Sequence, residues 1–182
     1  MKDNNHSKAL NLIKLILTRL DGGVADYWKV YKLLYFIDFE NYSKTKKSIT
    51  GYNYYNWKYG PLPYKDNDEY KDSNINLIKI GIEQQLWTEL DNKTIQIKDF
   101  VDPLNGFDIT EQLSFDNIMD RYSKLTGSEL VALSHEDTPY LMTQLTELID
   151  YDYVFWRESK PDVVTDITDQ ILNNPKYVRA IN

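Results

Sequence analysis

The sequence predicts an α+β fold: a mostly helical single domain with one small antiparallel sheet. Apolar residues recur at helical spacing along most of the chain, and two stretches, 52–59 and 86–98, alternate in the manner of strands. No repeat, low-complexity tract or linker divides the 182 residues. We therefore expect a main domain over residues 1–145 and a C-terminal helical extension, 146–182, packed on the same domain.

The chain opens with an amphipathic helix, predicted over residues 8–20. Ser7 is placed to cap its start, and Gly22 and Gly23 follow its end. Its apolar residues recur every three or four positions, as one face of a helix requires. They are Ala9, Leu12, Ile13, Ile16, Leu17 and Leu20.

A second helix is predicted over residues 26–42, and it is apolar nearly all round. Such a helix has no face to turn to water, so it should lie at the centre of the core. Lys32, Asp38 and Glu40 are charged exceptions along it. They either form a functional site or, as we favour, mark a polar stripe that reaches solvent.

The stretch TGYNYYNWKYGPLPY, residues 50–64, is dense in aromatic side chains. Its 52–59 portion reads as a strand with apolar contacts on both faces, because successive side chains of a strand point to opposite sides. One face carries Tyr52 and Tyr54, and the other carries Tyr55, Trp57 and Tyr59. The Gly60-Pro61 pair then ends the strand.

The middle of the chain predicts one helix and one hairpin. The helix covers residues 76–85, although Gly81 weakens it. Residues 86–90 and 94–98 alternate on either side of an Asp-Asn-Lys turn, which is the pattern of a β-hairpin.

Helical spacing then resumes over residues 111–124. Thr126 and Glu129 form a capping-box pattern that opens a further helix over 127–134. A break and a short helical turn follow at 135–140.

The C-terminal residues are less clear. Residues 149–158 are ambiguous between helix and strand, and residues 63–74 are hydrophilic and predict a loop or short helix. Two closing helices are predicted over 165–172 and 175–181.

The charge balance disfavours nucleic acid as a partner. The chain has 21 basic and 28 acidic residues, a formal net charge of −7 and a pI near 4.9, so it repels phosphates. A helix followed by a hairpin is also the order found in winged-helix domains. The predicted hairpin, however, sets Lys93 and Lys98 against Glu89, Asp91 and Asp99, and a phosphate-binding wing would be more basic.

The sequence predicts a cytoplasmic protein with no membrane partner. The first residues, MKDNNHSKAL, are polar and unlike a signal peptide. No apolar run approaches the ~18 residues that a membrane-spanning helix needs. Cysteine is absent, which rules out disulfides and fits a reducing compartment.

Residues that could carry catalysis are few. The two histidines are His6 and His135, and no phosphate-binding loop, dinucleotide fingerprint, HExxH motif or nucleophile elbow is present. His135, Glu136 and Asp137 could form part of a metal site, but His6 lies in the N-terminal residues, and the lack of a second histidine in the ordered chain argues against it. We therefore expect no metal, no cofactor and no catalytic residue, and a structural role for His135.

Three blocks occur in an order that resembles a known family. They are KLLYFIDF (32–39), WKYGPLP (57–63) and GSELVALSHEDTPY (127–140). Together they resemble the Panacea domain, the SocA-like or GepA-like family of bacterial and phage antitoxins, over roughly residues 8–145. WKYGPLP is the most specific of the three.

The resemblance implies structural roles for the residues that the motifs share. At the end of the third block, it implies that His135 and Asp137 bond to nearby backbone groups. This chain departs from the family pattern at Lys46 and Thr138, where glycine is usual, and at Tyr140, where tryptophan is usual. The motif residues given structural roles are Lys32, Trp57, Gly60, Pro61, His135, Asp137, Pro139 and Tyr140.

The family is thought to neutralise a toxin by protein contact, without catalysis. The resemblance therefore implies an antitoxin of a toxin-antitoxin system, with a cognate protein toxin as partner. The acidic charge suits a basic toxin. Two alternatives stay open: a proteolytic adaptor that delivers the toxin to a protease, and a hydrolase or metal-binding enzyme centred on His135 and Asp137.

The aromatic residues supply a candidate partner-binding surface, because Tyr and Trp are enriched at interfaces. A small sheet cannot bury both faces of the 52–59 strand, so one tyrosine pair should stay partly exposed beside a rigid turn. Alternatively, the tail with Tyr151, Tyr153, Phe155 and Trp156 covers the whole patch. The candidate partner-binding residues are Tyr52, Tyr54, Tyr55, Tyr59 and Pro61.

Overall fold

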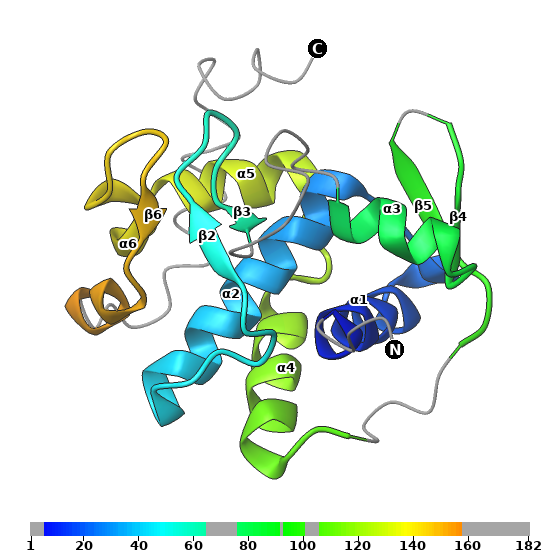
Figure 1. The fold of residues 1–182 in the computed structure, drawn as a ribbon, viewed down its shortest axis with the longest axis horizontal. Helices are drawn as coiled ribbons and strands as arrows, with labels where there is room; N and C mark the ends of the chain where they lie inside the picture. Colours follow the sequence, from blue (N-terminus) through cyan, green and yellow to red (C-terminus); the bar gives the residue numbers. More distant parts are fainter. Residues whose placement is uncertain (1–5, 65–75, 92, 101–105, 158–182) are drawn as a thin grey trace.

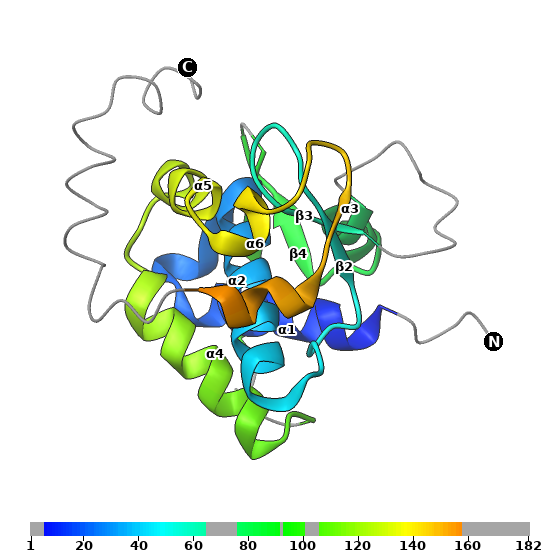
Figure 2. The ribbon, with the colours of Figure 1, turned by 90° about the vertical axis from the view of Figure 1, so that its left-hand side faces the viewer.

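The computed structural model describes residues 6–64, 76–91, 93–100 and 106–157, which Figures 1 and 2 show from two sides. The helices are α1 (Ser7–Arg19), α2 (Tyr27–Thr45), α3 (Asn76–Glu83), α4 (Ile109–Tyr122), α5 (Gly127–His135) and α6 (Thr138–Leu141), with 3-10 helices η1 (Asp21–Gly23) and η2 (Tyr151–Trp156). The strands are β1 (Val24–Asp26), β2 (Asn53–Tyr55), β3 (Leu62–Tyr64), β4 (Trp87–Glu89), β5 (Thr94–Ile97) and β6 (Leu148–Ile149). The predicted mostly helical α+β fold is confirmed. Within these ranges no helix has both the length and the apolar character to cross a bilayer.

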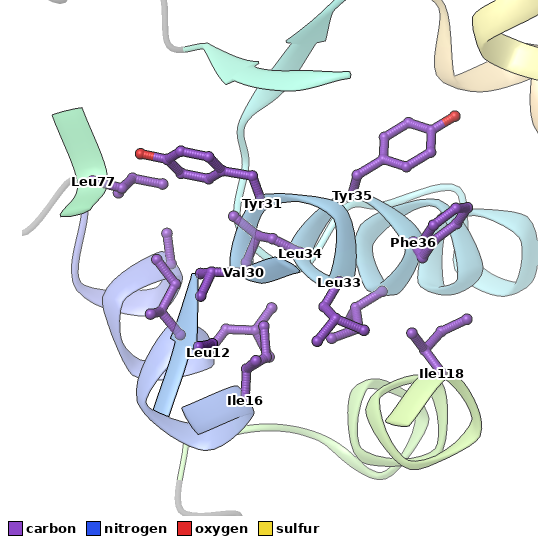
Figure 3. Close-up of a cluster of buried hydrophobic side chains, with 14 of the residues drawn as sticks. Leu12, Ile16, Val30, Tyr31, Leu33, Leu34, Tyr35, Phe36, Leu77 and Ile118 are labelled. Carbon is purple, nitrogen blue, oxygen red and sulfur yellow. The ribbon is translucent and has the colours of Figure 1, made fainter. Parts of the chain in front are cut away.

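Helix α2 runs through the middle of the molecule, as its composition predicts (Figure 1). Every residue over 30–39 is buried. Figure 3 shows Leu12 and Ile16 of α1 below α2, and Tyr31 and Tyr35 leaving its opposite side. Helices α4 and α5 also pack against it. Because α2 is covered on several sides, its apolar residues need no single stripe.

Both ends of α2 are fixed by local hydrogen bonds. The Asp26 side chain caps the start by accepting the backbone N–H of Lys29 at 3.0 Å. At the other end Lys46 adopts the left-handed conformation (φ 56°), and its N–H donates to the carbonyl of Tyr42 at 2.8 Å. The tight turn that the family builds with glycine is therefore kept by a lysine, at a cost of about 1 kcal/mol.

The described strands form two three-stranded antiparallel sheets, not the single predicted sheet (orders β1-β5-β4 and β3-β2-β6). The β4-β5 hairpin is confirmed, but β1 is its third strand. The prediction that the 52–59 strand joins the 86–98 hairpin was wrong. Strand β2 is short. It pairs instead with β3, which follows it after a turn, and with β6, which lies far away in the sequence.

Helix starts were the best predicted boundaries. The Thr126 and Glu129 capping box of α5 is present with both of its hydrogen bonds, and α4 begins at a second such box, Asp108 with Glu111. Ser7 is not a cap, because His6 occupies that position in α1. The glycine pair after α1 forms η1 and leads into β1, a strand too short to leave a sequence signal.

The segment after α5 folds back onto α2. In the ambiguous 149–158 stretch, β6 pairs with β2 and is followed by η2. The Tyr151 ring stacks on Phe39 at a centroid distance of 4.3 Å, and its hydroxyl donates to the Tyr52 carbonyl at 2.6 Å. The helices predicted over 165–172 and 175–181, and most of the 63–74 loop, lie outside the described residues.

Asp38 ties the chain that follows α2 to the helix. Its fully buried carboxylate accepts the backbone N–H groups of Ile49 at 2.8 Å and Thr50 at 3.0 Å, the Tyr54 hydroxyl at 2.8 Å, and the Thr50 hydroxyl. Lys32 is also fully buried. The expectation that these charges reach solvent was therefore wrong: four donors from one downstream segment replace water around Asp38.

We predict that Asp38→Asn lowers the free energy of unfolding by about 2 kcal/mol at pH 7, because an amide cannot accept all four hydrogen bonds and leaves buried donors unpaired. Chemical denaturation measures this. Tyr54→Phe is the control: it removes one donor, leaves Asp38 three partners, and should cost about 1 kcal/mol. Equal losses in the two variants would contradict the central role of the carboxylate.

Burial raises the pKa of Asp38 to about 6, against the lowering effect of its hydrogen bonds. The unfolded pKa is about 3.9, so the folded state binds this proton more tightly. The resulting stabilisation is complete below about pH 4 and is lost as the pH rises through about 6. The stability difference between the native protein and Asp38→Asn should therefore shrink by roughly 2 kcal/mol from pH 4 to pH 7.

Candidate protein-interaction site

Residues of the three motif blocks meet in the interior, although they are far apart in the sequence. Lys32 lies on α2, Gly60 and Pro61 form the turn after β2, and Ser134 lies near the end of α5. The Lys32 ammonium donates to the Pro61 carbonyl at 2.7 Å. The Ser134 hydroxyl is buried and donates to the carbonyl of Val131 at 2.7 Å.

Gly60 is required at this meeting point for two reasons. Its φ of +83° lies in the left-handed region that favours glycine. A Cβ there would also come within 2.4 Å of the Ser134 hydroxyl oxygen and 2.7 Å of Lys32 Cε. The turn therefore packs directly onto both side chains, which is why this chain needs glycine at position 60.

The electrostatics around Lys32 favour a supporting role. Burial lowers the pKa of its amine well below the usual range, and Asp26 offsets only part of this effect. The Trp28 ring lies 5.5 Å from the ammonium nitrogen. Lys32 thus contacts the Pro61 carbonyl and the face of the Trp28 ring, and through these contacts it holds the Gly60-Pro61 turn against α2.

Asp137, after α5, is bound by side chains and not by backbone groups as the resemblance implied. It accepts the Tyr35 hydroxyl at 2.6 Å and a two-pronged contact from Arg157 at 2.8 and 2.7 Å. Asp137 also raises the pKa of Tyr35, adding to the larger effect of burial. Arg157 was not predicted, although it is the first basic residue after Lys124 and follows an aromatic run.

The remaining residues of the third block brace the end of β2. The rings of His135 and Tyr140 pack at 4.8 Å, and the Tyr140 hydroxyl donates to the Trp57 carbonyl at 3.1 Å. Pro139 is buried in the first turn of α6. Tyrosine thus links the two segments at the position where the family pattern has tryptophan.

The candidate partner-binding residues divide into two groups. Tyr52 and Tyr54 are buried, Tyr54 completely, and Pro61 is buried as well, so their side chains belong to the core. Tyr55 and Tyr59 are half-buried. Tyr55 packs against the Tyr64 ring at 4.7 Å and Tyr59 against Trp28 at 5.2 Å. The predicted surface is therefore reduced to these two tyrosines.

Trp57 is more exposed than any of those tyrosines, at 37%. It was predicted to be a structural motif residue. Its backbone carbonyl does accept the Tyr140 hydroxyl, but more than a third of the residue is exposed. Among the residues that the structure describes, no three His, Cys, Asp or Glu side chains are grouped so that they could hold a metal ion.

The site thus belongs to a mostly helical α+β domain in which motif residues bond to one another in the interior and aromatic residues remain at the end of β2. The chain is a member of the antitoxin SocA-like, Panacea domain family, whose match covers residues 30–140, more than half of its length. No curated protein and no solved structure gave a significant match.

We predict that Gly60→Ala lowers the free energy of unfolding by about 3 kcal/mol, the sum of left-handed strain and the collision with Ser134 and Lys32. Gly51→Ala is the matched control, because Gly51 also has a positive φ (+69°) but nothing lies within 4 Å of its added Cβ. It should cost only the strain, about 1 kcal/mol. Thermal or chemical denaturation of the two variants measures this difference. Equal losses of unfolding free energy in Gly60→Ala and Gly51→Ala would rule out the tight contact at Gly60.

Proposed function

We propose that this protein is the antitoxin of a bacterial or phage-associated toxin-antitoxin system and that it neutralises its toxin by direct binding in the cytoplasm. Membership of the antitoxin SocA-like, Panacea domain family carries this proposal. The partner is a cognate protein toxin, and the antitoxin acts without catalysing a reaction.

The interior of the site supports binding over catalysis. A hydrolase or metal-binding enzyme centred on His135 and Asp137 needs an available carboxylate. Arg157 contacts both oxygens of Asp137, and Tyr35 donates to one of them. Asp137 is thus occupied in holding the segment after α5 onto α2, which favours a structural role.

The surface supports a protein partner. Tyr55 and Tyr59 are half-buried, and neighbouring rings hold them in place. Such side chains bury a large area on binding and lose little rotamer freedom. The net charge of −7 adds attraction toward a basic toxin and repels nucleic acid.

We predict that the full chain restores growth to cells that express the toxin gene beside its own, and that the two purified proteins elute together from a sizing column. Toxin activity in vitro should fall as the antitoxin is added, with no other component present. A chain that neither binds nor protects against the adjacent gene product would overturn the proposal.

The adaptor alternative predicts a different result. If the protein delivers the toxin to a protease, the amount of intact toxin in rescued cells falls, and rescue disappears in a strain that lacks the protease. Under direct inhibition the toxin accumulates in an inactive complex. Immunoblots of the toxin with and without the antitoxin therefore separate the two mechanisms.

A further inference from the structure

We propose that the toxin docks through a basic, apolar segment onto the 141–148 face, which we define as Trp57, Leu141, Met142, Leu145 and Leu148. This inference rests on the proposed antitoxin function and adds where the partner binds and what its contact segment is like. Three observations carry it: exposed apolar side chains, a rigid support beneath them, and a predominantly acidic charge around them.

The 141–148 face gathers apolar side chains that are left in water. Their exposures are 37% for Trp57, 62% for Leu141, 39% for Met142, 59% for Leu145 and 43% for Leu148. Four of the five lie within eight residues, from Leu141 at the end of α6 to Leu148 at the start of β6. Exposed apolar residues concentrated in this way mark interaction sites more often than scattered ones do.

Hydrogen bonds join Trp57 and the 141–148 segment into one structure. The buried Asn56 side chain donates to the carbonyls of Tyr140 at 3.0 Å and Thr143 at 2.7 Å. The Asn56 backbone N–H donates to Glu147 at 2.9 Å, and its carbonyl accepts the N–H of Thr146 at 2.7 Å. Strand β6 then places Leu148 opposite Tyr55.

Figures 1 and 2 both show this segment arching beside the end of β2. A loop that is held at four points by one residue is already ordered before a partner arrives. Binding to it costs little conformational entropy, which is the property of a preorganised interface.

The charge around the face is predominantly negative, although the exposed base Lys58 directly follows Trp57. Between Lys124 and Arg157 the chain contains no lysine or arginine. It contains six acids there: Glu129, Glu136, Asp137, Glu147, Asp150 and Asp152. Glu136, Glu147, Asp150 and Asp152 are exposed. An apolar centre with an acidic rim fits a segment that is apolar and basic.

The same charge disfavours a second copy of this chain as the occupant. A symmetric dimer through the face would bring the acidic rims of two chains together, and each chain carries a net charge of −7. A basic partner removes this repulsion.

The chain provides matched controls for a direct test. Leu145 in the face and Leu113 on α4 are the same residue type at 59% and 58% exposure. Leu148 in the face and Leu90 after β4 form a second pair, at 43% and 44%. Each pair loses the same kind of side chain from a similar degree of burial, so a general effect of exposed leucines on solubility or folding cancels.

The experiment measures rescue and toxin affinity for Leu145→Arg, Leu145→Glu, Leu148→Arg, Leu113→Arg and Leu90→Arg in the full chain. Leu145→Arg and Leu148→Arg should weaken toxin binding at least about tenfold, while the controls match the native protein. Leu145→Glu should bind more tightly than Leu145→Arg, because both remove apolar area and only the sign of the added charge differs. Melting temperatures report folding for every variant.

The outcomes separate this inference from the proposed function. If the native chain fails to bind or rescue, the antitoxin function is wrong. If the native chain rescues, and the face variants and their controls bind equally well, the function stands and the docking surface is wrong. Equal binding by Leu145→Glu and Leu145→Arg would overturn the basic character of the partner segment. A dimer of this chain that Leu145→Arg splits would make the face a self-interface and overturn the docking proposal.

Discussion

The fold depends on burying α2 on every side. Such a helix can carry a charged residue only if another part of the chain replaces water around it. The downstream segment supplies both replacements, since Ile49, Thr50 and Tyr54 donate to Asp38 and the Pro61 carbonyl accepts from Lys32. The path of residues 49–61 is thereby fixed by two charges six positions apart on one helix.

The same constraint extends to the end of the described chain. Tyr35 of α2 donates to Asp137, and Asp137 in turn binds Arg157. The family match ends at residue 140, yet the segment beyond it supplies β6 for the sheet and this arginine for the motif acid. In this chain the residues after the matched region complete the packing of α2.

Periodicity and local hydrogen bonding made much of the fold predictable. The core helices, the β4-β5 hairpin and the capping box at Thr126 depend on residues close together in the sequence. The sheet pairing was missed because β2 and β6 are only three and two residues long and lie far apart in the chain. Lys32, Asp38 and Arg157 were misjudged or missed for the same reason, since each partner is at least eleven residues away.

The family motif and the proposed contact surface have different physical requirements. Gly60 has no room for a side chain, and Lys32 and Asp137 each bond to a partner from another segment, so all three serve the internal packing of the domain. The leucines of the 141–148 face meet no such internal demand. The motif residues are thus suited to identify the domain. The exposed residues of the 141–148 face are suited to determine which partner it binds.

The placement of the cations makes that surface more acidic than the net charge suggests. Lys32 is fully buried, and Arg157 directs its guanidinium at Asp137 with only 28% of its side chain exposed. Arg157 is the next base after Lys124, so its inward orientation leaves the exposed acids Glu147, Asp150 and Asp152 without a neighbouring base in the sequence. A cation that points inward stabilises the fold and leaves the electrostatic potential at the surface negative. A negative surface potential attracts a basic protein over about one Debye length.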